Sequence, residues 1–219
     1  MGNKLEQVDK VLNKISEGRE YRNVREIRIA ETTDENEKRV TGYATIFNEP
    51  YLLYDWGDYK VYEIIDRHAF DECDMSDVIM QYDHEGRVFA RKSNGTLTIN
   101  PDDRGLRCDA DLSGTTIGQQ LYEEIKGGYT TKMSFGFRIA EQKREVVEDM
   151  EHNLTTVTRT ITKIARLYDV SAVSLPANDA TEISARSYCE GVIAELQAER
   201  LEIAKKIRKR KLIKILSEA

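Results

Sequence analysis

The pattern that most limits the possible folds is the alternation of apolar and polar side chains in two long segments. Between Thr130 and Ala140, one side of the chain carries large apolar residues and the other carries small or charged ones: Met133, Phe135, Phe137 and Ile139 against Lys132, Ser134, Gly136 and Arg138. Residues 155–164 are mostly β-branched. A period of two and β-branched composition are typical of strands. We therefore predict two paired strands, with the charged segment Glu141–Leu154 as their hairpin tip.

Shorter alternating or apolar segments, separated by turn residues, extend this pattern through most of the chain. We predict further strands at Val24–Ile29, Arg39–Phe47, Lys60–Asp66, Asp77–Tyr82, Val88–Arg91, Thr96–Ile99, Gly105–Asp111 and Arg166–Leu175. A helix is predicted from the capping residues at 113–116 to Lys126, where Gly127 and Gly128 end it. Many short strands with inserted helices predict a mixed β-barrel with peripheral helices, in which the strands are antiparallel.

The two ends of the chain differ from this central part. Residues 1–22 are polar with apolar residues at helical spacing, so we expect an N-terminal helical arm before a barrel domain at residues 23–187. Residues 188–219 are predicted to form a C-terminal helix. This helix is strongly basic between Arg200 and Lys214, with eight cations against the single acid Glu202. It is either a solvated helix or an arm that docks on an acidic partner or nucleic acid.

Composition excludes several classes of function. The chain has 219 residues and a formal net charge of -6, which makes general nucleic-acid binding unlikely for the protein as a whole. No apolar run has the length of about 18 residues that a membrane span needs, so no membrane contact is expected. The cysteines Cys73, Cys108 and Cys189 lie far apart and lack the spacing of a metal site. We therefore predict neither a metal nor a cofactor.

Ser134 is a candidate nucleophile, because its strand would hold a small hydroxyl on the face opposite a packed apolar row. Most strand serines are surface residues, so this hypothesis requires a base and an orienting acid. Of the three histidines, His84 has the best context, since it follows a buried strand and precedes a Gly turn. His68 fits a capping or packing role, and His152 fits an exposed position in the charged tip.

Asp169 is the candidate acid, because it lies among apolar residues of a predicted strand, where an unpaired carboxylate is costly. It would either orient His84 or form a salt bridge with Arg166 or Arg138. The chain order His84, Ser134, Asp169 differs from that of the chymotrypsin, subtilisin and α/β-hydrolase triads. Nor does a glycine stand two residues before Ser134, as in a nucleophile elbow.

Between Arg25 and Ser187 the chain resembles the prohead (capsid maturation) proteases of tailed bacteriophages. The resemblance rests on several motifs in order: Gly42-Tyr43-Ala44 with Phe47-Asn48, Ala69-Phe70, Tyr82-Asp83-His84, Gly95-Thr96-Leu97, Asp103-Arg104-Gly105-Leu106, Met133-Ser134-Phe135-Gly136-Phe137, and the run from Tyr168 to Ala177. Together these motifs are specific, whereas any one alone would not be.

The resemblance implies a fold similar to the herpesvirus assembly proteases, and a serine endopeptidase that cleaves scaffold and capsid proteins, and itself, by an acyl-enzyme mechanism. It assigns the nucleophile to Ser134 and the base to His84. The third residue in this family is usually Glu, and Asp169 stands in its place. Expected partners are the phage major capsid protein and scaffold, inside the assembling prohead in the cytoplasm of the bacterial host. A homodimer or higher oligomer is expected by analogy.

Two alternatives to an active protease remain at this point. One is a catalytically inactive scaffolding protein built on the protease fold. The other is a scaffold–protease fusion in which residues 190–219 bind coat protein and the barrel removes that tail. Backbone N–H groups would stabilise the oxyanion, and the regions of Arg91-Lys92 and of Arg166 are the candidates for them.

Overall fold

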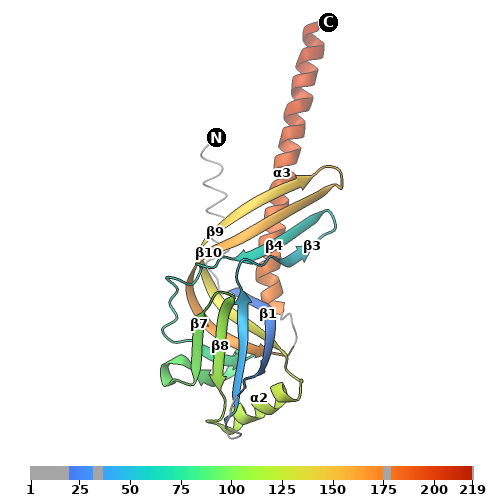
Figure 1. The fold of residues 1–219 in the computed structure, drawn as a ribbon. Coiled ribbons are helices and arrows are strands. Elements are labelled where there is room, and N and C mark those ends of the chain that lie inside the picture. The colour runs from blue at the N-terminus through green and yellow to red at the C-terminus, as the bar shows by residue number, and fades with distance from the viewer. Residues whose placement is uncertain (1–19, 32–36, 175–178, 219) are drawn as a thin grey trace.

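The computed structural model describes residues 20–31, 37–174 and 179–218 (Figure 1). Along these residues the elements follow in the order β1 (Glu20–Ile29), β2 (Arg39–Ile46), β3 (Tyr51–Asp55), β4 (Tyr59–Ile65), β5 (Ile79–Tyr82), β6 (Glu85–Arg91), η1 (Lys92–Asn94), β7 (Leu97–Pro101), β8 (Gly105–Asp111), α2 (Thr116–Lys126), β9 (Lys132–Asp149), β10 (Leu154–Val173) and α3 (Asp179–Glu218). The predicted N-terminal arm falls almost wholly on residues 1–19, which lie outside the described residues, and β1 begins at Glu20.

The long strand β10 is the centre of the sheet. It pairs with β9 in antiparallel orientation over nearly its whole length. On its other side, residues 155–161 pair with β4 and residues 169–172 pair with β5, both in parallel orientation. The order of the main path is β3-β4-β10-β9-β1-β2-β8-β7, with β6 added beside β5. The sheet is therefore mixed, and the expectation of antiparallel strands was wrong for these two neighbours of β10.

The prediction of a closed barrel was also wrong for the part of the chain that the structure describes. Its strands form an open path, in which β6 pairs only with β5 and β7 pairs only with β8. Between β6 and β7 the chain passes through η1 and then Gly95. The positive φ of Gly95, 80°, allows the chain to change direction there, before β7 begins. A short 3₁₀ turn thus occupies the place where a ladder between β6 and β7 would close the barrel.

The segment predicted as a hairpin tip is instead part of a long two-stranded arm. β9 continues to Asp149 and β10 starts at Leu154, so only residues 150–153 form the turn. The two strands predicted at 155–164 and from 166 onward are one strand with register shifts. In Figure 1 the arm, together with β3 and β4, projects above the strands β7, β8, β2 and β1. Charged residues predominate toward the tip, where most side chains are exposed, and Arg144 and Glu148 form ion pairs with α3.

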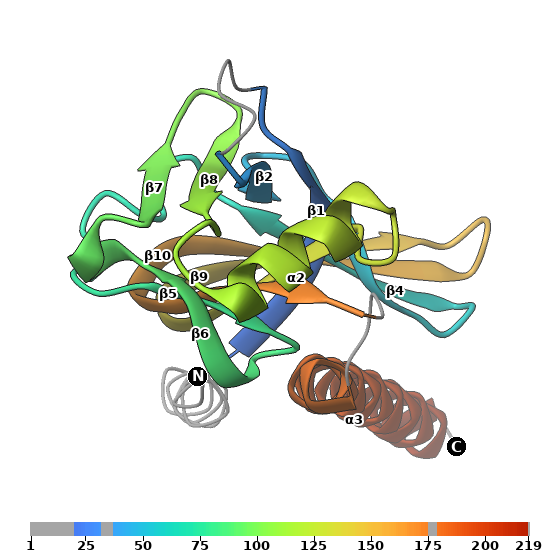
Figure 2. The same ribbon diagram turned by 90° about the horizontal axis from the view of Figure 1, so that it is seen from below.

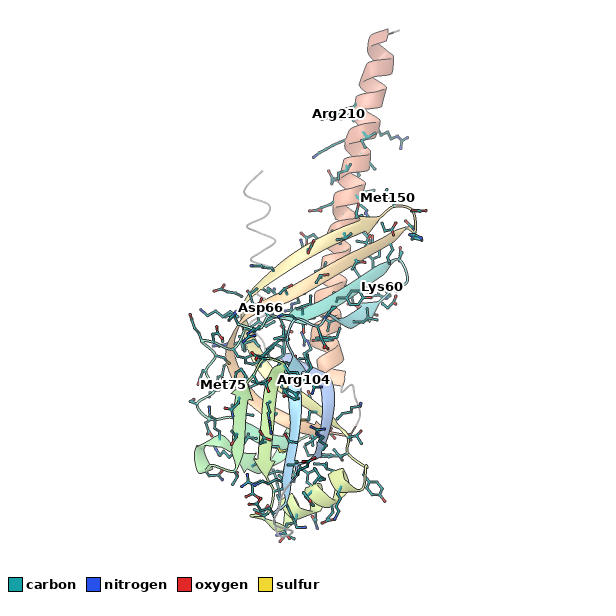
Figure 3. The ribbon with its side chains drawn as sticks, viewed as in Figure 1. Lys60, Asp66, Met75, Arg104, Met150 and Arg210 are labelled. Carbon is teal, nitrogen blue, oxygen red and sulfur yellow. The ribbon has the colours of Figure 1, made fainter. Side chains whose placement is uncertain are left out.

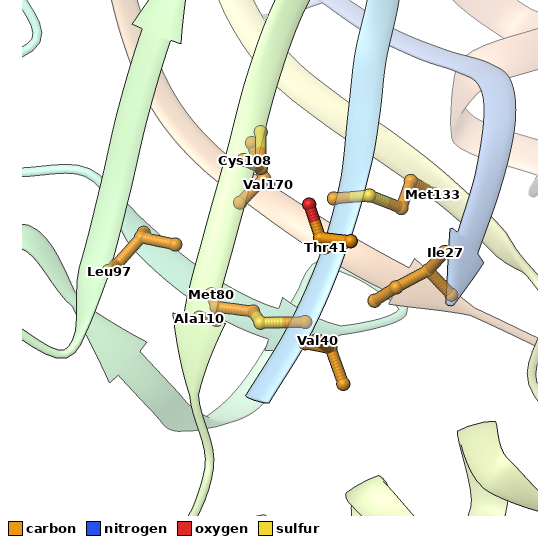
Figure 4. A pocket seen from close by; sticks show the side chains of 9 residues that line it. All are labelled: Ile27, Val40, Thr41, Met80, Leu97, Cys108, Ala110, Met133 and Val170. Atoms are coloured by element: carbon orange, nitrogen blue, oxygen red, sulfur yellow. The ribbon is translucent and has the colours of Figure 1, made fainter. Parts of the chain in front are cut away.

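Two apolar clusters hold the fold together. The larger one fills the body and includes Phe135, Phe137 and Ile161, and the smaller one lies between the arm and α3 and includes Val157 and Cys189. The interior of the body is lined by Ile27, Val40, Thr41, Met80, Leu97, Cys108, Ala110, Met133 and Val170 (Figure 4). This lining is almost entirely apolar, which identifies it as core rather than as a ligand site.

Four buried charged residues separate the two clusters. On β4, Glu63 lies between Val61 of the smaller cluster and Ile65 of the larger one, and Arg159 on β10 is its direct partner in the parallel ladder. Arg159 and Arg22 both bind Glu63, and both bind Glu20 as well. We call Glu20, Arg22, Glu63 and Arg159 the buried ion quartet.

The two helices pack very differently. As predicted, α2 starts at the N-cap Thr115, whose hydroxyl accepts from the Gly118 N–H, and ends at Gly127; it covers the lower end of the body (Figure 2). The C-terminal helix starts earlier than predicted, and it packs through Cys189, Val192, Ile193 and Leu196. From residue 197 to 210 it is exposed, and Figure 3 shows Arg210 well beyond Met150 at the arm tip. Among the described helices, none is both long and apolar enough to cross a membrane.

Candidate active site

Ser134 is held rigidly by the strand that carries it. Its neighbours Met133 and Phe135 point into the body core and are almost wholly buried. The serine lies on the opposite face of β9, directly across from Ser171 of β10 and beside Asn23 of β1. Strand partners on both sides fix the backbone, so the hydroxyl has a defined position, as the alternating pattern predicted.

Asp169 lies on the neighbouring strand and on the same face. It is paired with Gly136, and a register shift between Leu167 and Asp169 lets β10 accommodate an extra residue there. Such a bulge redirects the side chains that follow it. The Ser171 hydroxyl, two residues along β10, donates to Asp169 Oδ2 at 2.8 Å. The carboxylate is therefore oriented by its own strand as well as by the histidine described next.

His84 is carried by a tight turn between β5 and β6. Tyr82 pairs with Glu85, so Asp83 and His84 are the two residues of the hairpin loop. Both have positive φ, 49° and 60°, which the twist-matched two-residue hairpin turns require and which costs energy in a non-glycine residue.

The turn is anchored to the end of β10. The Asp83 N–H donates to the Ala172 carbonyl at 2.9 Å, and the Asp83 carboxylate accepts from the Ser174 N–H and hydroxyl at 2.9 and 2.7 Å. These bonds hold the strained turn over β10, and with it the imidazole.

The three side chains form one hydrogen-bonded chain. His84 Nδ1 lies 2.5 Å from Asp169 Oδ2, and His84 Nε2 lies 2.6 Å from Ser134 Oγ. With the imidazole proton on Nδ1, that nitrogen donates to the carboxylate, and the serine hydroxyl donates to Nε2. A hydroxyl aligned on the lone pair of an imidazole can lose its proton to that imidazole, and a carboxylate behind the ring stabilises the resulting cation.

The three hydrogen-bonded side chains are shielded from solvent. Ser134 and Asp169 have no exposed surface, and the side chain of His84 is 4% exposed. A low-dielectric surrounding strengthens hydrogen bonds and charge interactions among these groups. It also means that a peptide cannot touch the serine hydroxyl in this conformation.

Other candidates from the sequence lie elsewhere. His68 pairs with Asp71 and His152 pairs with Asp149, both on exposed surface. The Arg91 guanidinium binds Asp77 at the far end of β6, and Arg166 lies four residues along β9 from the level of Ser134. The described residues contain no group of three or more side chains that could hold a metal ion.

Two supporting residues escaped the sequence reasoning, namely Ser171 and Asp83. Ser171 stands two residues after Asp169, so the alternation of a strand places it on the same face, and this signal was available. The role of Asp83 depends on contact with Ser174, which is 91 residues away in the sequence. No local pattern could have indicated that contact.

The chain was compared with known proteins, solved structures and protein families to find out to which family it belongs. No curated protein and no solved structure matched the chain. The family model described as caudovirus prohead serine protease matches residues 25–192, which is more than half of the chain. The matched range contains β5, β9 and β10, the strands that bring His84, Ser134 and Asp169 together. The chain therefore belongs to the caudovirus prohead serine protease family.

Proposed function

We propose that this protein is a serine endopeptidase that cleaves scaffold and capsid proteins, and itself, during maturation of a phage prohead. In this proposal Ser134 is the nucleophile, His84 the general base and Asp169 the residue that orients it. The observation that supports it is the continuous hydrogen-bonded chain from Asp169 through His84 to Ser134, at 2.5 and 2.6 Å. Family membership supports the class of reaction.

The proposed reaction has two halves. Ser134 Oγ attacks the scissile carbonyl carbon while its proton passes to His84 Nε2, and the imidazolium is stabilised by Asp169. The tetrahedral intermediate then expels the amine, which takes that proton from His84, and an ester to Ser134 remains. Water attacks the ester, losing a proton to His84, and the collapse of the second intermediate releases the acid and regenerates the hydroxyl.

The burial of Ser134 implies that the protease is latent in this conformation. A peptide can reach the Ser134 hydroxyl only when the residues that bury it move. Latency suits an enzyme whose substrates are the building blocks of the shell, because cleavage before assembly would destroy them. The proposed place of action is the assembling prohead, in the cytoplasm of the bacterial host, with the major capsid protein and scaffold as partners.

The decisive experiment is co-expression of the full chain with the candidate capsid protein, followed by intact-mass measurement of both. Wild type, Ser134→Ala and Ser171→Ala are compared. Ser171 is the matched control, because it is a buried serine directly opposite Ser134 that touches Asp169 but not the imidazole. We expect cleavage with wild type and with Ser171→Ala, and intact chains with Ser134→Ala. If the wild-type mixture also stays intact under assembly conditions, the proposal is wrong.

One observation favours a second candidate, a catalytically inactive scaffolding protein built on the protease fold. Ser134 has no exposed surface at all, as it would in a protein that never admits a peptide. The same experiment separates the two candidates, since an inactive scaffold would still promote assembly of shells while leaving both masses unchanged.

A further inference from the structure

Two arginines face each other across the β9–β10 ladder. Arg138 on β9 is the direct partner of Arg166 on β10. Like charges at directly opposite positions of an antiparallel pair repel each other and destabilise it. Such an arrangement therefore creates a place where an anion bound between the two side chains would be favoured.

The pair lies on the same face as the candidate nucleophile. From Ser134 to Ile139 the strand β9 keeps its alternation, with Phe137 and Ile139 buried and Arg138 exposed between them. The register shifts near this point are absorbed by β10. Ser134, Gly136 and Arg138 thus share one face, and four residues of strand separate Ser134 from Arg138, or about 13 Å. Gly136 contributes no side chain between them.

The basic residues in this part of the β9–β10 ladder differ in whether they have an acidic partner. Lys163 pairs with Glu72 at 2.5 Å and stands opposite Glu141 in the ladder. Arg166 approaches Asp74 at 3.5 Å and lies over the Tyr168 ring at 5.2 Å. Arg138, in contrast, has no hydrogen bond or ion pair within the part of the chain that the structure describes. Its guanidinium offers a planar fork of donors that fits a carboxylate.

We propose that Arg138, assisted by Arg166, binds an aspartate or glutamate of the substrate about four residues from the scissile bond. An extended peptide advances about 3.3 Å per residue, so a chain lying along β9 from Ser134 reaches Arg138 with its fourth residue. The proposal rests on the proposed protease function and deepens it, since it assigns the chemistry of one specificity site on the same face of β9.

The test is a cleavage profile on a library of peptides from a digested proteome, read by mass spectrometry. Four full-length proteins are compared: wild type, Arg138→Glu, Lys143→Glu and Ser134→Ala. Lys143 is the matched control, because it is an exposed cation on the same strand, nine residues from Ser134, and its substitution changes the net charge equally. Thermal unfolding of each variant confirms that it is folded.

We expect wild type and Lys143→Glu to favour Asp or Glu over Gln at the fourth position on one side of the cut by about five-fold, the order of an exposed ion pair. Arg138→Glu should lose this preference and favour Lys or Arg there. Cleavage that depends on Ser134 but shows no acidic preference, or the same preference in Arg138→Glu, overturns the specificity site alone. Equal cleavage by Ser134→Ala, or no cleavage by wild type in the presence of the assembling capsid protein, overturns the proposed protease function and this site with it.

Discussion

The candidate active site and the buried ion quartet are both buried polar clusters that include a residue of the long strand β10, yet their hydrogen-bond networks differ. In the quartet each carboxylate binds both arginines, and Arg159 also binds Gln142 and Glu63 also binds Tyr51, so the charges neutralise one another. In the candidate site, hydrogen bonds run from the Asp169 carboxylate through the His84 imidazole to the Ser134 hydroxyl.

This difference explains why one cluster suits structure and the other suits chemistry. A closed set of two positive and two negative groups has no reactive atom to offer, and its contribution is to fix how the arm joins the body. A series of hydrogen bonds that ends at a hydroxyl offers a nucleophile, because the hydroxyl can transfer its proton to the imidazole to which it is hydrogen-bonded. The predictions below test this contrast, beginning with the largest expected effect.

Asp169→Asn should reduce cleavage by about 10³- to 10⁴-fold with little loss of folded protein, because an amide favours the wrong imidazole tautomer and cannot stabilise the cation. The readout is kcat/KM on any peptide that the wild type cuts, together with thermal unfolding. Asp169→Glu restores the acid that the family usually has and should retain far more activity than the amide. Equal activity of Asp169→Asn and wild type would remove Asp169 from the mechanism.

Arg159→Met should destabilise the fold by about 3–5 kcal/mol, because it leaves two buried carboxylates with one arginine. The free energy of unfolding in urea measures this loss. Arg144→Met is the control: Arg144 is the direct ladder partner of Arg159, but its side chain is 25% exposed and its ion pair with Glu195 should contribute less than about 1 kcal/mol. Similar losses in the two variants would show that the quartet has no special structural role.

Acid should reduce the stability of the fold more through the quartet than through an exposed ion pair. Burial opposes ionisation of Glu20, but attraction to Arg22 and Arg159 prevails and lowers its pKa from 4.5 to about 2. A carboxyl with a lowered folded-state pKa stabilises the fold above its unfolded pKa, and this contribution disappears as the pH falls from about 4.5 toward 2. The pKa shift corresponds to about 3 kcal/mol at neutral pH.

Unfolding free energies measured from pH 7 to pH 2.5 test this expectation. In Glu20→Gln, the free energy of unfolding should fall less than in the wild type as the pH is lowered from about 4.5 to 2.5. Asp77→Asn is the comparison, since the hydrogen bond from Arg91 also lowers the pKa of Asp77 to about 2, but at an exposed site where solvent screens the pair. We expect its acid limb to follow the wild type. An unchanged limb in Glu20→Gln would contradict the assigned role of Glu20.

Ser171→Ala should have the smallest effect. It removes one hydrogen bond to Asp169 and leaves the imidazole contacts intact, so we expect a loss of about 1 kcal/mol in stability and a few-fold decrease in kcat/KM. The same peptide assay and urea titration measure both. A loss as large as that of Asp169→Asn would place Ser171 within the catalytic chain itself.

The strand pattern could be predicted from the sequence, but its closure could not. Alternation at Met133–Ile139 correctly identified the residues of β9 that pack into the apolar core, since side-chain period is a local property. Whether β6 and β7 pair depends on the path of η1 between them, which no period reveals. The parallel pairing of β10 with β4 and β5 joins residues about 90 to 100 positions apart, and alternation is the same in parallel and antiparallel strands.

The same limit applies to the candidate site. Alternation placed Ser134 on an outer face, and context favoured His84 over His68 and His152, but the roles of all three residues came from the family resemblance. Their meeting depends on register between strands, because His84 is 50 residues from Ser134 and 85 from Asp169. The two-residue turn at Asp83-His84, which directs the imidazole, uses positive φ at residues that usually avoid it.

The central place of β10 also sets the order of events during synthesis. It is the last strand of the sheet to leave the ribosome, and it holds β9, β4 and β5 in place as well as supplying Asp169. A nascent chain that ends before Val173 therefore lacks a complete sheet. In such a chain, the contact between His84 and Ser134 is not yet supported by β10. Because such long-range pairing is slow, the proposed active site should form only after a delay that follows release of the full chain.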